Sequence, residues 1–364
     1  MDVIANSMED SLLTLGHDVI NFQPVSPLER FAPNRIVMRY LRYADYARQV
    51  VKSANSYGAD IQHVVDHGYA HLVPHLKSKL RICNAHDLIP LLTWKGRIEE
   101  LDLDGQPIGS GKKSRKPLLN LHSLNFLKKF DHIVTISEST ANDLVDYLGI
   151  SNDRITVIPP ALNPAFGPTD TSLIKSFRKK HDLDESIKWV MLSGREAYKN
   201  HPNAFRAIHQ LSESTGQKIG IVRAGLASRE FDELVNRYAM QDITRSVFLD
   251  HSELPALYSA VDCLLFPSLY EGFGMPVAEA VACGTPAVVS NRGSLPEVAG
   301  DLAVMVDPFD IVGLAEALKL AIYDNRYRGY VRQKGFNAMA KYHPHKIGQS
   351  LDELYSRLTI SLND

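Results

Sequence analysis

Apolar runs of strand length recur through the second half of the chain and alternate with segments of helical character. The runs are Trp189–Leu192, Ile219–Val222, Val247–Leu249, Cys263–Phe266, Ala287–Val289 and Leu302–Val306. The segments between them that favour helices are 201–213, 228–240, 253–260, 276–283 and 311–323. Continuous apolar strands separated by helices are typical of a parallel sheet covered on both faces. The pattern therefore predicts a doubly wound α/β domain.

The first half repeats this scheme less regularly. One face of an N-terminal helix is apolar, through Ile4, Met8, Leu12 and Leu15. A helix is expected over 36–56, and strands are expected at Asp18–Phe22, Ile61–Val65, Leu80–Asn84, His132–Ile136 and Ile155–Ile158. A second Rossmann-like domain is therefore expected in this half, and the two domains should face a cleft.

The domain boundary is expected at the proline-rich stretch 159–168, which breaks all regular structure. The amphipathic segment 346–359 has no strand after it and is expected to pack back onto the first domain. We therefore expect an N-terminal domain of residues 1–163 plus 342–364 and a C-terminal domain of residues 164–341. Residues 93–118 form an irregular, glycine-rich insertion, which in a compact domain is usually functional or disordered.

Composition excludes several classes of protein. The 364 residues include 40 Lys plus Arg and 42 Asp plus Glu, so the chain lacks the basic field typical of nucleic-acid binding. An odd number of widely spaced cysteines builds neither a zinc site nor a disulfide framework: Cys83, Cys263 and Cys283. No apolar run of transmembrane length and no basic leader is present, so a cytoplasmic protein is expected.

The stretch 266–289 has the strongest chemical pattern in the chain. A strand leads through a loop to a helix that begins near Pro276 and ends by Gly284. Free backbone N–H groups at a helix start favour anions and hydroxyl oxygens. The groups expected to be free are those of Gly274, Met275 and Val277.

Two carboxylates and two glycines accompany this helix start. Gly272 and Gly274 allow a ligand to approach the backbone closely. Glu271 is expected in the loop and Glu279 in the first helical turn, where carboxylates that accept hydroxyl groups suit a sugar or a ribose. The alternative is a helix N-terminus with favourable acidic residues that binds nothing.

A second cluster, Gly194 and Arg195 followed by Lys199, comes directly after the strand at 189–192. Gly194 permits a sharp exit from the strand, and the two cations then lie at its carboxyl end. An arginine fork and a lysine point charge can together hold a diphosphate. The alternative for such a pair taken alone is a solvated loop with two surface charges.

Several motifs combine around these clusters. They are Glu271-Gly-Phe-Gly-Met-Pro-Val-Ala-Glu279, Ser193-Gly-Arg195 with Lys199-Asn200, Ala260-Val-Asp262, Gly284-Thr-Pro286 and Gly293-Ser-Leu-Pro-Glu297. With these motifs the sequence resembles the retaining family-4 glycosyltransferases of the GT-B fold, whose signature is E-x7-E. The resemblance is dense from about 187 to 323. It is looser in the first domain, where Ala85-His-Asp-Leu88 and Ile136-Ser-Glu138 match, and it reaches back to about residue 10.

The resemblance implies a retaining, metal-independent hexosyltransferase whose co-substrate is a nucleotide-diphosphate sugar and which needs no other cofactor. By matching position, Arg195 and Lys199 would bind the diphosphate beside Gly194, and Glu279 would bind the ribose. The donor sugar would be held by Glu271 and the amides of Gly272, Phe273, Gly274 and Met275. The residues implied in catalysis are Glu271, Arg195, Lys199 and His86, the last reaching the sugar from the first domain.

The implied chemistry is the departure of a nucleoside diphosphate. Fixed cations act on the charge that grows as the glycosidic bond breaks. No pair of carboxylates suits a nucleophile and an acid as in hydrolases, which favours front-face attack with the leaving phosphate taking the acceptor proton. The acceptor would be a glycan or a lipid-linked sugar in polysaccharide biosynthesis. The resemblance alone favours GDP-mannose, and the sequence leaves base, sugar and acceptor open.

Three other patterns are interpreted as decoys. His63, His67, His71 and His75 recur every four residues, but Gly68 and Pro74 interrupt a helix there. The Asp102-Leu-Asp104 sequence imitates a metal-binding D-x-D but lies in the insertion, so it is interpreted as a solvated acidic turn. The glycine-rich stretch 109–114 resembles a P-loop without its spacing or its strand.

Between Lys112 and Lys129 there are six basic residues and no acidic ones. A solvated loop and helix face explains them. The alternative is contact with an anionic lipid headgroup or a lipid-diphosphate acceptor, which would place the protein at the inner face of a membrane.

The start of the chain departs from the family pattern. Family members begin with a strand and a glycine-rich loop, whereas here a helix begins almost at Met1 and the first glycine is Gly16. We therefore expect a first domain that lacks its opening strand. One alternative is a nucleotide-sugar-binding protein with little turnover, because the opening strand is missing. A separate alternative is a pyridoxal-phosphate-dependent GT-B phosphorylase, which needs an active-site lysine and a much larger chain.

Overall fold

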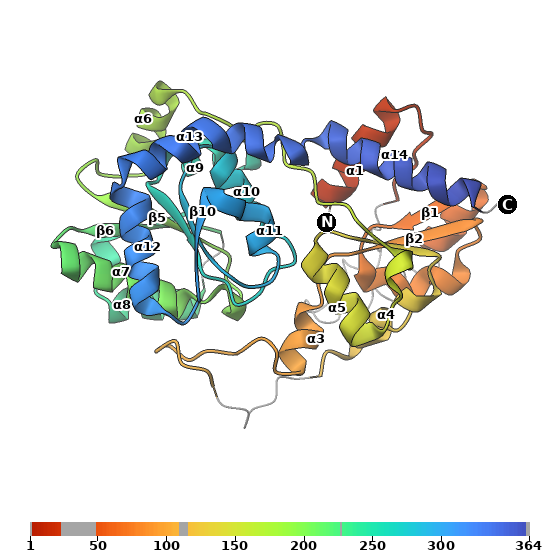
Figure 1. Cartoon of the computed structure of the whole chain (residues 1–364), viewed down its shortest axis with the longest axis horizontal. Coiled ribbons are helices and arrows are strands. Elements are labelled where there is room, and N and C mark those ends of the chain that lie inside the picture. The colour runs from red at the N-terminus through yellow and green to blue at the C-terminus, as the bar shows by residue number, and fades with distance from the viewer. Residues whose placement is uncertain (1, 23–48, 109–115, 226–227, 362–364) are drawn as a thin grey trace. The chain divides into compact units, whose positions relative to one another are not determined.

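The computed structural model describes residues 2–22, 49–108, 116–225 and 228–361, and the chain divides into two compact units (Figure 1). Unit 1 comprises Met1–Leu91, Lys116–Ala161 and Pro344–Asp364. Unit 2 comprises Leu92–Arg115 and Leu162–His343. This division differs from the expected domains chiefly in the insertion, because residues 92–115 group with unit 2.

Unit 2 is built around a six-stranded parallel sheet. Its strands are β5 (Lys188–Ser193), β6 (Ile219–Ala224), β7 (Thr244–Val247), β8 (Cys263–Phe266), β9 (Ala287–Ser290) and β10 (Ala303–Val306). They lie in the order β10-β9-β8-β5-β6-β7, and every neighbouring pair is parallel. This is the strand order of a doubly wound Rossmann sheet, so the predicted fold class is confirmed.

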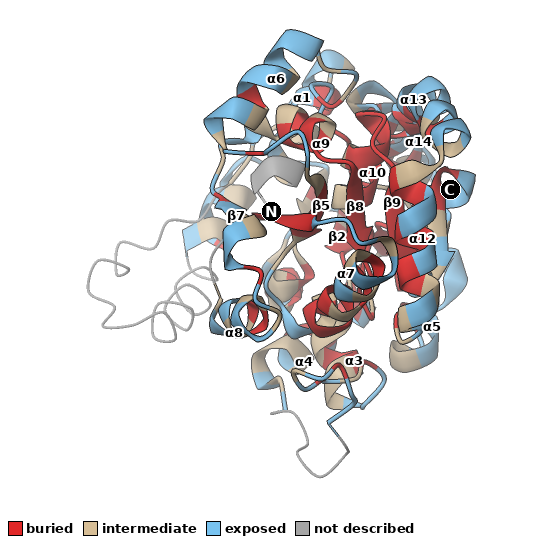
Figure 2. Ribbon diagram, turned by 90° about the vertical axis from the view of Figure 1, so that its left-hand side faces the viewer, coloured by how far each residue is buried: buried red, intermediate tan, exposed pale blue. Residues whose placement is uncertain are grey.

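Helices cover this sheet. They are α6 (Thr171–Lys180), α7 (His201–Thr215), α8 (Arg229–Arg237), α9 (Leu254–Ala260), α10 (Met275–Ala282), α11 (Leu295–Ala299), α12 (Ile311–Tyr323) and α13 (Asn325–Met339). Strands β8 and β9 are buried along their length, and β5 is buried except at its two end residues (Figure 2). The core on one face joins Val190 and Ile221 of the sheet to Phe205 of α7 and Leu318 of α12.

Unit 1 has a smaller sheet in the described residues. Its parallel strands, in the order β1-β2-β3-β4, are β1 (Ile61–Val64), β2 (Leu80–Ala85), β3 (His132–Thr135) and β4 (Ile155–Val157). Its helices are α1 (Asp2–Thr14), 49–56, α4 (Leu118–Leu124), α5 (Glu138–Leu148) and α14 (Pro344–Ile360). The short helix α3 (Ile89–Trp94) lies where unit 1 passes into unit 2.

Helix α14 packs on α1 in unit 1, as the amphipathic pattern of 346–359 predicted (Figure 1). The approach is close, because a Cβ on Gly348 would lie 2.6 Å from Cβ of Ser11. The Ser11 hydroxyl also donates to the Pro344 carbonyl at 3.1 Å. The segment 344–360 therefore completes the core of the unit to which α1 belongs.

Two predicted strands are corrected. Residues 17–22 form no strand, and Ile20 is half exposed, so the predicted strand Asp18–Phe22 is wrong. Val19 instead packs against the α1–α14 core. The strand predicted at Val247–Leu249 is β7, which begins three residues earlier among polar residues because it lies at the sheet edge. Most of the predicted helix 36–56, and the place of an opening strand, lie outside the described residues.

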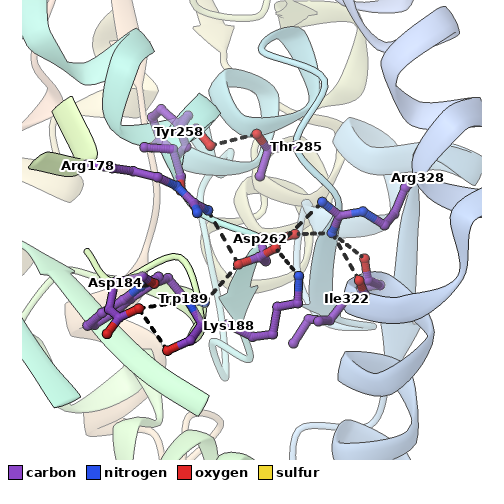
Figure 3. A network of polar contacts seen from close by, with 12 residues as sticks. Arg178, Asp184, Lys188, Trp189, Tyr258, Asp262, Thr285, Ile322 and Arg328 are labelled. Carbon is purple, nitrogen blue, oxygen red and sulfur yellow. Dashed lines mark hydrogen bonds and ion pairs between the residues drawn. The ribbon is translucent and has the colours of Figure 1, made fainter. Parts of the chain in front are cut away.

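The amino ends of β5 and β8 are joined by a charged network around Asp262 (Figure 3). The Trp189 N–H donates to its buried carboxylate at 2.9 Å. Three cations lie within 4 Å of the same carboxylate: Lys188 at 3.4 Å, Arg178 at 3.6 Å and Arg328 at 3.7 Å. The two arginines also bind carbonyls at the ends of α9 and α12, so the network fastens helices to the sheet. Asp262, which matched the family consensus, is thus a structural anchor.

No described helix has the length and apolarity to cross a membrane.

Candidate functional site

The chemistry-bearing residues of unit 2 gather at the carboxyl ends of β5 and β8. These two strands pair directly, with Val190 opposite Cys263 and Met191 opposite Leu264. The strand order reverses between them, which marks the switch point at which doubly wound sheets form their ligand crevice. The two sequence motifs that are 72 residues apart at Lys199 and Glu271 meet here.

The loop after β5 is shaped by one glycine and one left-handed asparagine. Gly194 has φ +85°, and a Cβ there would lie 2.7 Å from Cε of Lys199. Only glycine therefore lets the Lys199 side chain cross the loop. Asn200 has φ 58° and ψ 42°, is fully buried, and donates to the carbonyls of Pro267 (3.0 Å) and Pro308 (2.9 Å). The loop is thereby tied to the loops that follow β8 and β10.

The loop after β8 presents backbone donors. Gly274, at φ +102°, immediately precedes α10, and a Cβ on it would lie 2.6 Å from Leu295. Within the described chain, no acceptor is found for the N–H groups of Gly272, Phe273, Gly274 and Met275. The prediction that the N–H of Val277 is free is wrong, because this group donates to the Gly274 carbonyl at 2.9 Å. The donors at the helix start thus come from the glycine-rich loop.

Ser294, which the sequence did not single out, holds this loop in place. Its buried hydroxyl is 3.1 Å from the Glu271 carbonyl and 2.7 Å from the Phe273 carbonyl. Gly293 beside it permits the contact, because a Cβ there would lie 2.9 Å from the same Glu271 carbonyl oxygen. The Gly293-Ser-Leu-Pro-Glu297 motif therefore supports the glycine-rich loop after β8.

Lys199 and Glu271 form an ion pair with each other. The Lys199 Nζ lies 2.7 Å from Glu271 Oε1, and both side chains are about one-tenth exposed, at 11% and 10%. The ammonium also lies 4.6 Å from the centre of the Phe266 ring. The sequence assigned these residues to different parts of a donor, and the structure brings them together at one point of the crevice.

Arg195 is the exposed cation of the loop, with half of its side chain open to solvent. Its Nε lies 4.0 Å from a carboxylate oxygen of Glu196. Its backbone N–H donates to the same carboxylate at 3.0 Å. The guanidinium is therefore accessible to a ligand from solvent.

Glu279 lies within α10 as its fifth residue, so the prediction that it occupies the first turn is wrong. Tyr258 of α9, another residue that the sequence did not reveal, donates its hydroxyl to Glu279 Oε2 at 2.6 Å. Burial raises the pKa of Glu279 to about 7, and the Tyr258 hydrogen bond acts against that rise. The carboxyl group is thus poised to change charge near neutral pH.

His86 lies in unit 1, directly after β2. Its Nε2 is 2.7 Å from the Val65 carbonyl, and its ring faces His67 with 6.1 Å between ring centres. Burial and then the charge of His67 lower the His86 pKa, so the ring is neutral at neutral pH. A neutral imidazole can exchange hydrogen bonds with a sugar hydroxyl.

The remaining histidines of the decoy series do not share one helical face. His63 lies on β1 and bonds Tyr355 at 2.6 Å and Asn84 at 2.7 Å, whereas the other three lie in η2 (His67–His75). Among described residues no group of metal-ligating side chains is found.

The Asp102-Leu-Asp104 turn is more than a solvated acidic turn. Asp102 accepts the N–H groups of Asp104 and Gln106, each at 2.9 Å, and so closes the turn. Asp104 then binds Arg237 of α8, and Gly105 packs on Asn203 of α7, where a Cβ would lie 1.9 Å from the amide oxygen. The insertion therefore docks on unit 2 through this turn. The residues 109–115, with the P-loop-like stretch and part of the basic segment, lie outside the described residues.

Two family models together span most of the chain. The model for glycosyl transferases group 1 matches residues 174–338, and the model for glycosyltransferase family 4 matches residues 7–166. The first covers the strands and loops that build the crevice, and the second covers the sheet that contains β2 and the His86 position after it.

Curated relatives include mannosyltransferases. The chain is 31% identical over 270 residues to the serotype-specific mannosyltransferase WbdA of Escherichia coli, covering 72% of this chain and 31% of that protein. It is 28% identical over 213 residues to the O-antigen chain mannosyltransferase B of Escherichia coli, covering 57% and 56%. The chain thus spans about a third of the length of WbdA and about half of the length of mannosyltransferase B.

Solved structures of glycosyltransferases share the fold. Anabaena HepE in complex with UDP-glucose has a TM-score of 0.72 at 16% identity and covers 96% of this chain and 88% of that one. WaaG, a glycosyltransferase of lipopolysaccharide biosynthesis, has a TM-score of 0.71 at 14% identity, covering 96% and 94%. On its family models, its strand order and its E-x7-E loop, this chain belongs to family 4 of the glycosyltransferases, with the GT-B fold.

Proposed function

We propose that this chain transfers a hexose from a nucleotide-diphosphate sugar to a glycan or lipid-linked acceptor, with retention of the anomeric configuration. The observation that carries the proposal is the junction of Lys199, Glu271 and the four backbone donors of the glycine-rich loop at the switch point of a Rossmann sheet. Such a crevice combines charge for a phosphate with acceptors for hydroxyl groups.

We assign the roles of the residues from the family resemblance, and their positions in unit 2 support the assignment. Arg195 and Lys199 hold the diphosphate, Glu279 accepts the ribose hydroxyls, and the sugar lies against Glu271 and the amides of the loop. During turnover Lys199 binds the leaving phosphate and Glu271 binds the sugar. Between turnovers the two nearly buried charges neutralise each other. His86 contributes from unit 1 as a neutral hydrogen-bonding group.

The bond that breaks joins the anomeric carbon to the donor diphosphate. Negative charge then grows on the leaving phosphate, where Lys199 and Arg195 stabilise it. No described residue of the crevice is placed as a separate carboxylate nucleophile, because Glu271 is held by Lys199. Attack from the face of the leaving group, with the acceptor proton passing to the phosphate, therefore accounts for retention.

The mannosyltransferase relatives support mannose as the transferred sugar, and we propose GDP-mannose as its donor. The first test is calorimetric titration with GDP-mannose, UDP-glucose and UDP-galactose, followed by transfer assays of the bound donor with oligosaccharide and lipid-linked acceptors. NMR of the product gives the anomeric configuration. Binding without transfer to any acceptor would support the alternative of a nucleotide-sugar-binding protein, and an inverted product would contradict the proposed mechanism.

Transfer should need no divalent metal, because protein cations rather than a D-x-D site meet the diphosphate. We expect EDTA to leave the initial rate within about twofold of its value without chelator. A rate that vanishes in EDTA and returns with manganese would show that the phosphate chemistry has been assigned to the wrong groups.

A further inference from the structure

Arg223 occupies a place in unit 2 that the proposed mechanism does not use. It is the fifth of six residues in β6, and it pairs with Leu192 of β5 and Ser246 of β7. The residue after it, Ala224, pairs with Ser193, from which the donor loop leaves β5. Arg223 therefore lies at the carboxyl edge of the sheet, one strand away from the loop of Arg195 and Lys199.

The guanidinium of Arg223 is buried without hydrogen bonds. The side chain has no exposed surface, and none of the described residues pairs with its Nε, Nη1 or Nη2. Its Cζ lies 4.3 Å from the centre of the Phe231 ring of α8, and the charges of Asp232 and Glu196 act favourably on it without a hydrogen bond. A buried charge with unsatisfied donors is costly, and a functional role or a bound ion is among the reasons a protein keeps one.

The same aromatic ring links Arg223 to the end of the donor loop. His201, two residues after Lys199, packs edge-on against Phe231 with 5.4 Å between ring centres. Burial and then the charge of Arg223 lower the His201 pKa to about 4, so His201 is neutral and adds no positive charge. Burial lowers the Arg223 pKa, the charge of Asp232 raises it, and that of Arg195 lowers it in turn.

The charged side chains of the loops after β5 and β8 pair with one another. Lys199 is paired with Glu271 at 2.7 Å, and Arg195 lies 4.0 Å from Glu196. A departing nucleoside diphosphate is multiply anionic, so these four side chains alone leave it without net positive charge. Arg223 is the nearby cation whose hydrogen-bonding groups are not engaged by a described residue.

We propose that Arg223 is a further phosphate-binding residue of the donor site, held on Phe231 in the absence of donor and turned toward the diphosphate when the donor binds. The strand fixes the start of its side chain, and the flexible stem lets the guanidinium leave the ring. This inference rests on the proposed function, and it adds to it the residue that supplies net charge. The ligand class is the diphosphate of a nucleotide sugar.

The test is calorimetric titration of GDP and UDP, with guanosine and uridine alongside, into the wild type and Arg223→Met. Met removes the charge while keeping an unbranched, apolar side chain on Phe231. We expect affinity for the diphosphates to fall at least tenfold and affinity for the nucleosides to stay within twofold. The free variant should melt at or above the wild-type temperature, because an unpaired buried charge is gone.

Arg245→Met is the matched control. Arg245 lies on β7 and also sits over an aromatic ring, 5.6 Å from the centre of Trp189, away from the carboxyl edge of the sheet. Diphosphate affinity should stay within twofold in this variant. Arg223→Gln provides a second uncharged variant if Arg223→Met gives no folded protein.

Diphosphate affinity within twofold of the wild type in either folded Arg223 variant would overturn the inference and leave the proposed function intact. So would failure of both variants to fold, because Arg223 would then be a structural residue. A wild type that binds neither diphosphate nor any donor would instead overturn the proposed function, and the inference with it.

Discussion

Burial sets the charge state of Glu279, which ordinary glutamate chemistry would leave ionised. Its pKa of about 7 in the folded protein lies above the ordinary value of 4.5. Between these two values the folded state binds more protons than the unfolded state. The free energy of unfolding therefore falls as pH rises from about 4.5 to about 7, and this contribution is constant above that range.

Glu279→Gln should abolish this part of the pH dependence, because glutamine does not titrate. The wild type should lose on the order of 2–3 kcal/mol of stability between pH 5 and pH 8 that the variant does not lose. Urea unfolding at the two pH values measures the difference. An equal pH dependence in wild type and variant would show that Glu279 keeps an ordinary pKa.

Lys199 and Glu271 illustrate how one pair can serve both stability and ligand binding. Removing one partner takes the ion pair away from a charge that is about nine-tenths buried, which is more costly than removing both. Lys199→Met and Glu271→Gln should each lower the free energy of unfolding by about 3 kcal/mol. The double variant should recover at least half of either loss in urea unfolding, while donor binding stays impaired in all three. Additive losses would mean that the two side chains do not interact in solution.

At the scale of elements, the turn between η5 (Ala197–Lys199) and α7 decides where the donor cation lies. Asn200 holds this turn in a left-handed conformation and ties it to the loops after β8 and β10. Asparagine tolerates that conformation better than alanine, and its amide supplies the two hydrogen bonds.

Replacement of Asn200 separates the two contributions. Asn200→Gly loses the amide but keeps the backbone conformation, whereas Asn200→Ala loses both. We expect alanine to be less stable than glycine by roughly 1 kcal/mol, with both below the wild type. Thermal unfolding with diphosphate titration measures the series. Equal stability of the glycine and alanine variants would show that the left-handed backbone is not what asparagine provides.

Helix α13 shows why some elements escape sequence reasoning. Its residues are mostly polar, and its buried side chains are few. It is a helix because Asp324 caps its first turn and because Gly335 lies against α10, where a Cβ would be 2.1 Å from the Val281 carbonyl oxygen. Such a close contact between helices replaces the wide apolar stripe on which periodicity depends.

At the scale of the whole molecule, each unit has a sheet and a core of its own. The core around β5 and β6 belongs to unit 2, and the core around β2, α1 and α14 belongs to unit 1. The residues proposed to bind the donor nucleotide all lie in unit 2. A nucleoside diphosphate should therefore stabilise that unit in preference to the other.

Calorimetry of the intact chain should show two unfolding transitions. GDP or UDP should raise the midpoint temperature of only one of them. At a ligand concentration of a hundred times the dissociation constant, the bound unit gains about 2.7 kcal/mol. Glu279→Gln gives a control in which the same transition shifts less. If the midpoint temperatures of both transitions rise by the same amount, the two units unfold as one cooperative unit.

Many of the strands and motifs of this protein could be predicted from local patterns in its sequence. Continuous apolar runs predicted β8 and β9, because buried parallel strands have no polar face to interrupt them. The E-x7-E stretch and the Gly194 loop could be recognised because strand-end chemistry is concentrated in short segments. The family, the fold class and the identity of most candidate donor-site residues could therefore be predicted from the amino-acid sequence.

Tertiary structure alone decided which of these residues meet. The Lys199–Glu271 pair depends on β5 and β8 being neighbours, and the burial of Arg223 depends on α8 closing over β6. The apolar residues at 18–22 form no strand, and the acidic turn at Asp102 docks on α7 and α8. Charge pairing, burial and the pKa of Glu279 are properties of groups brought together from distant segments. A linear sequence contains those groups, and only their packing sets the distances on which the energies depend.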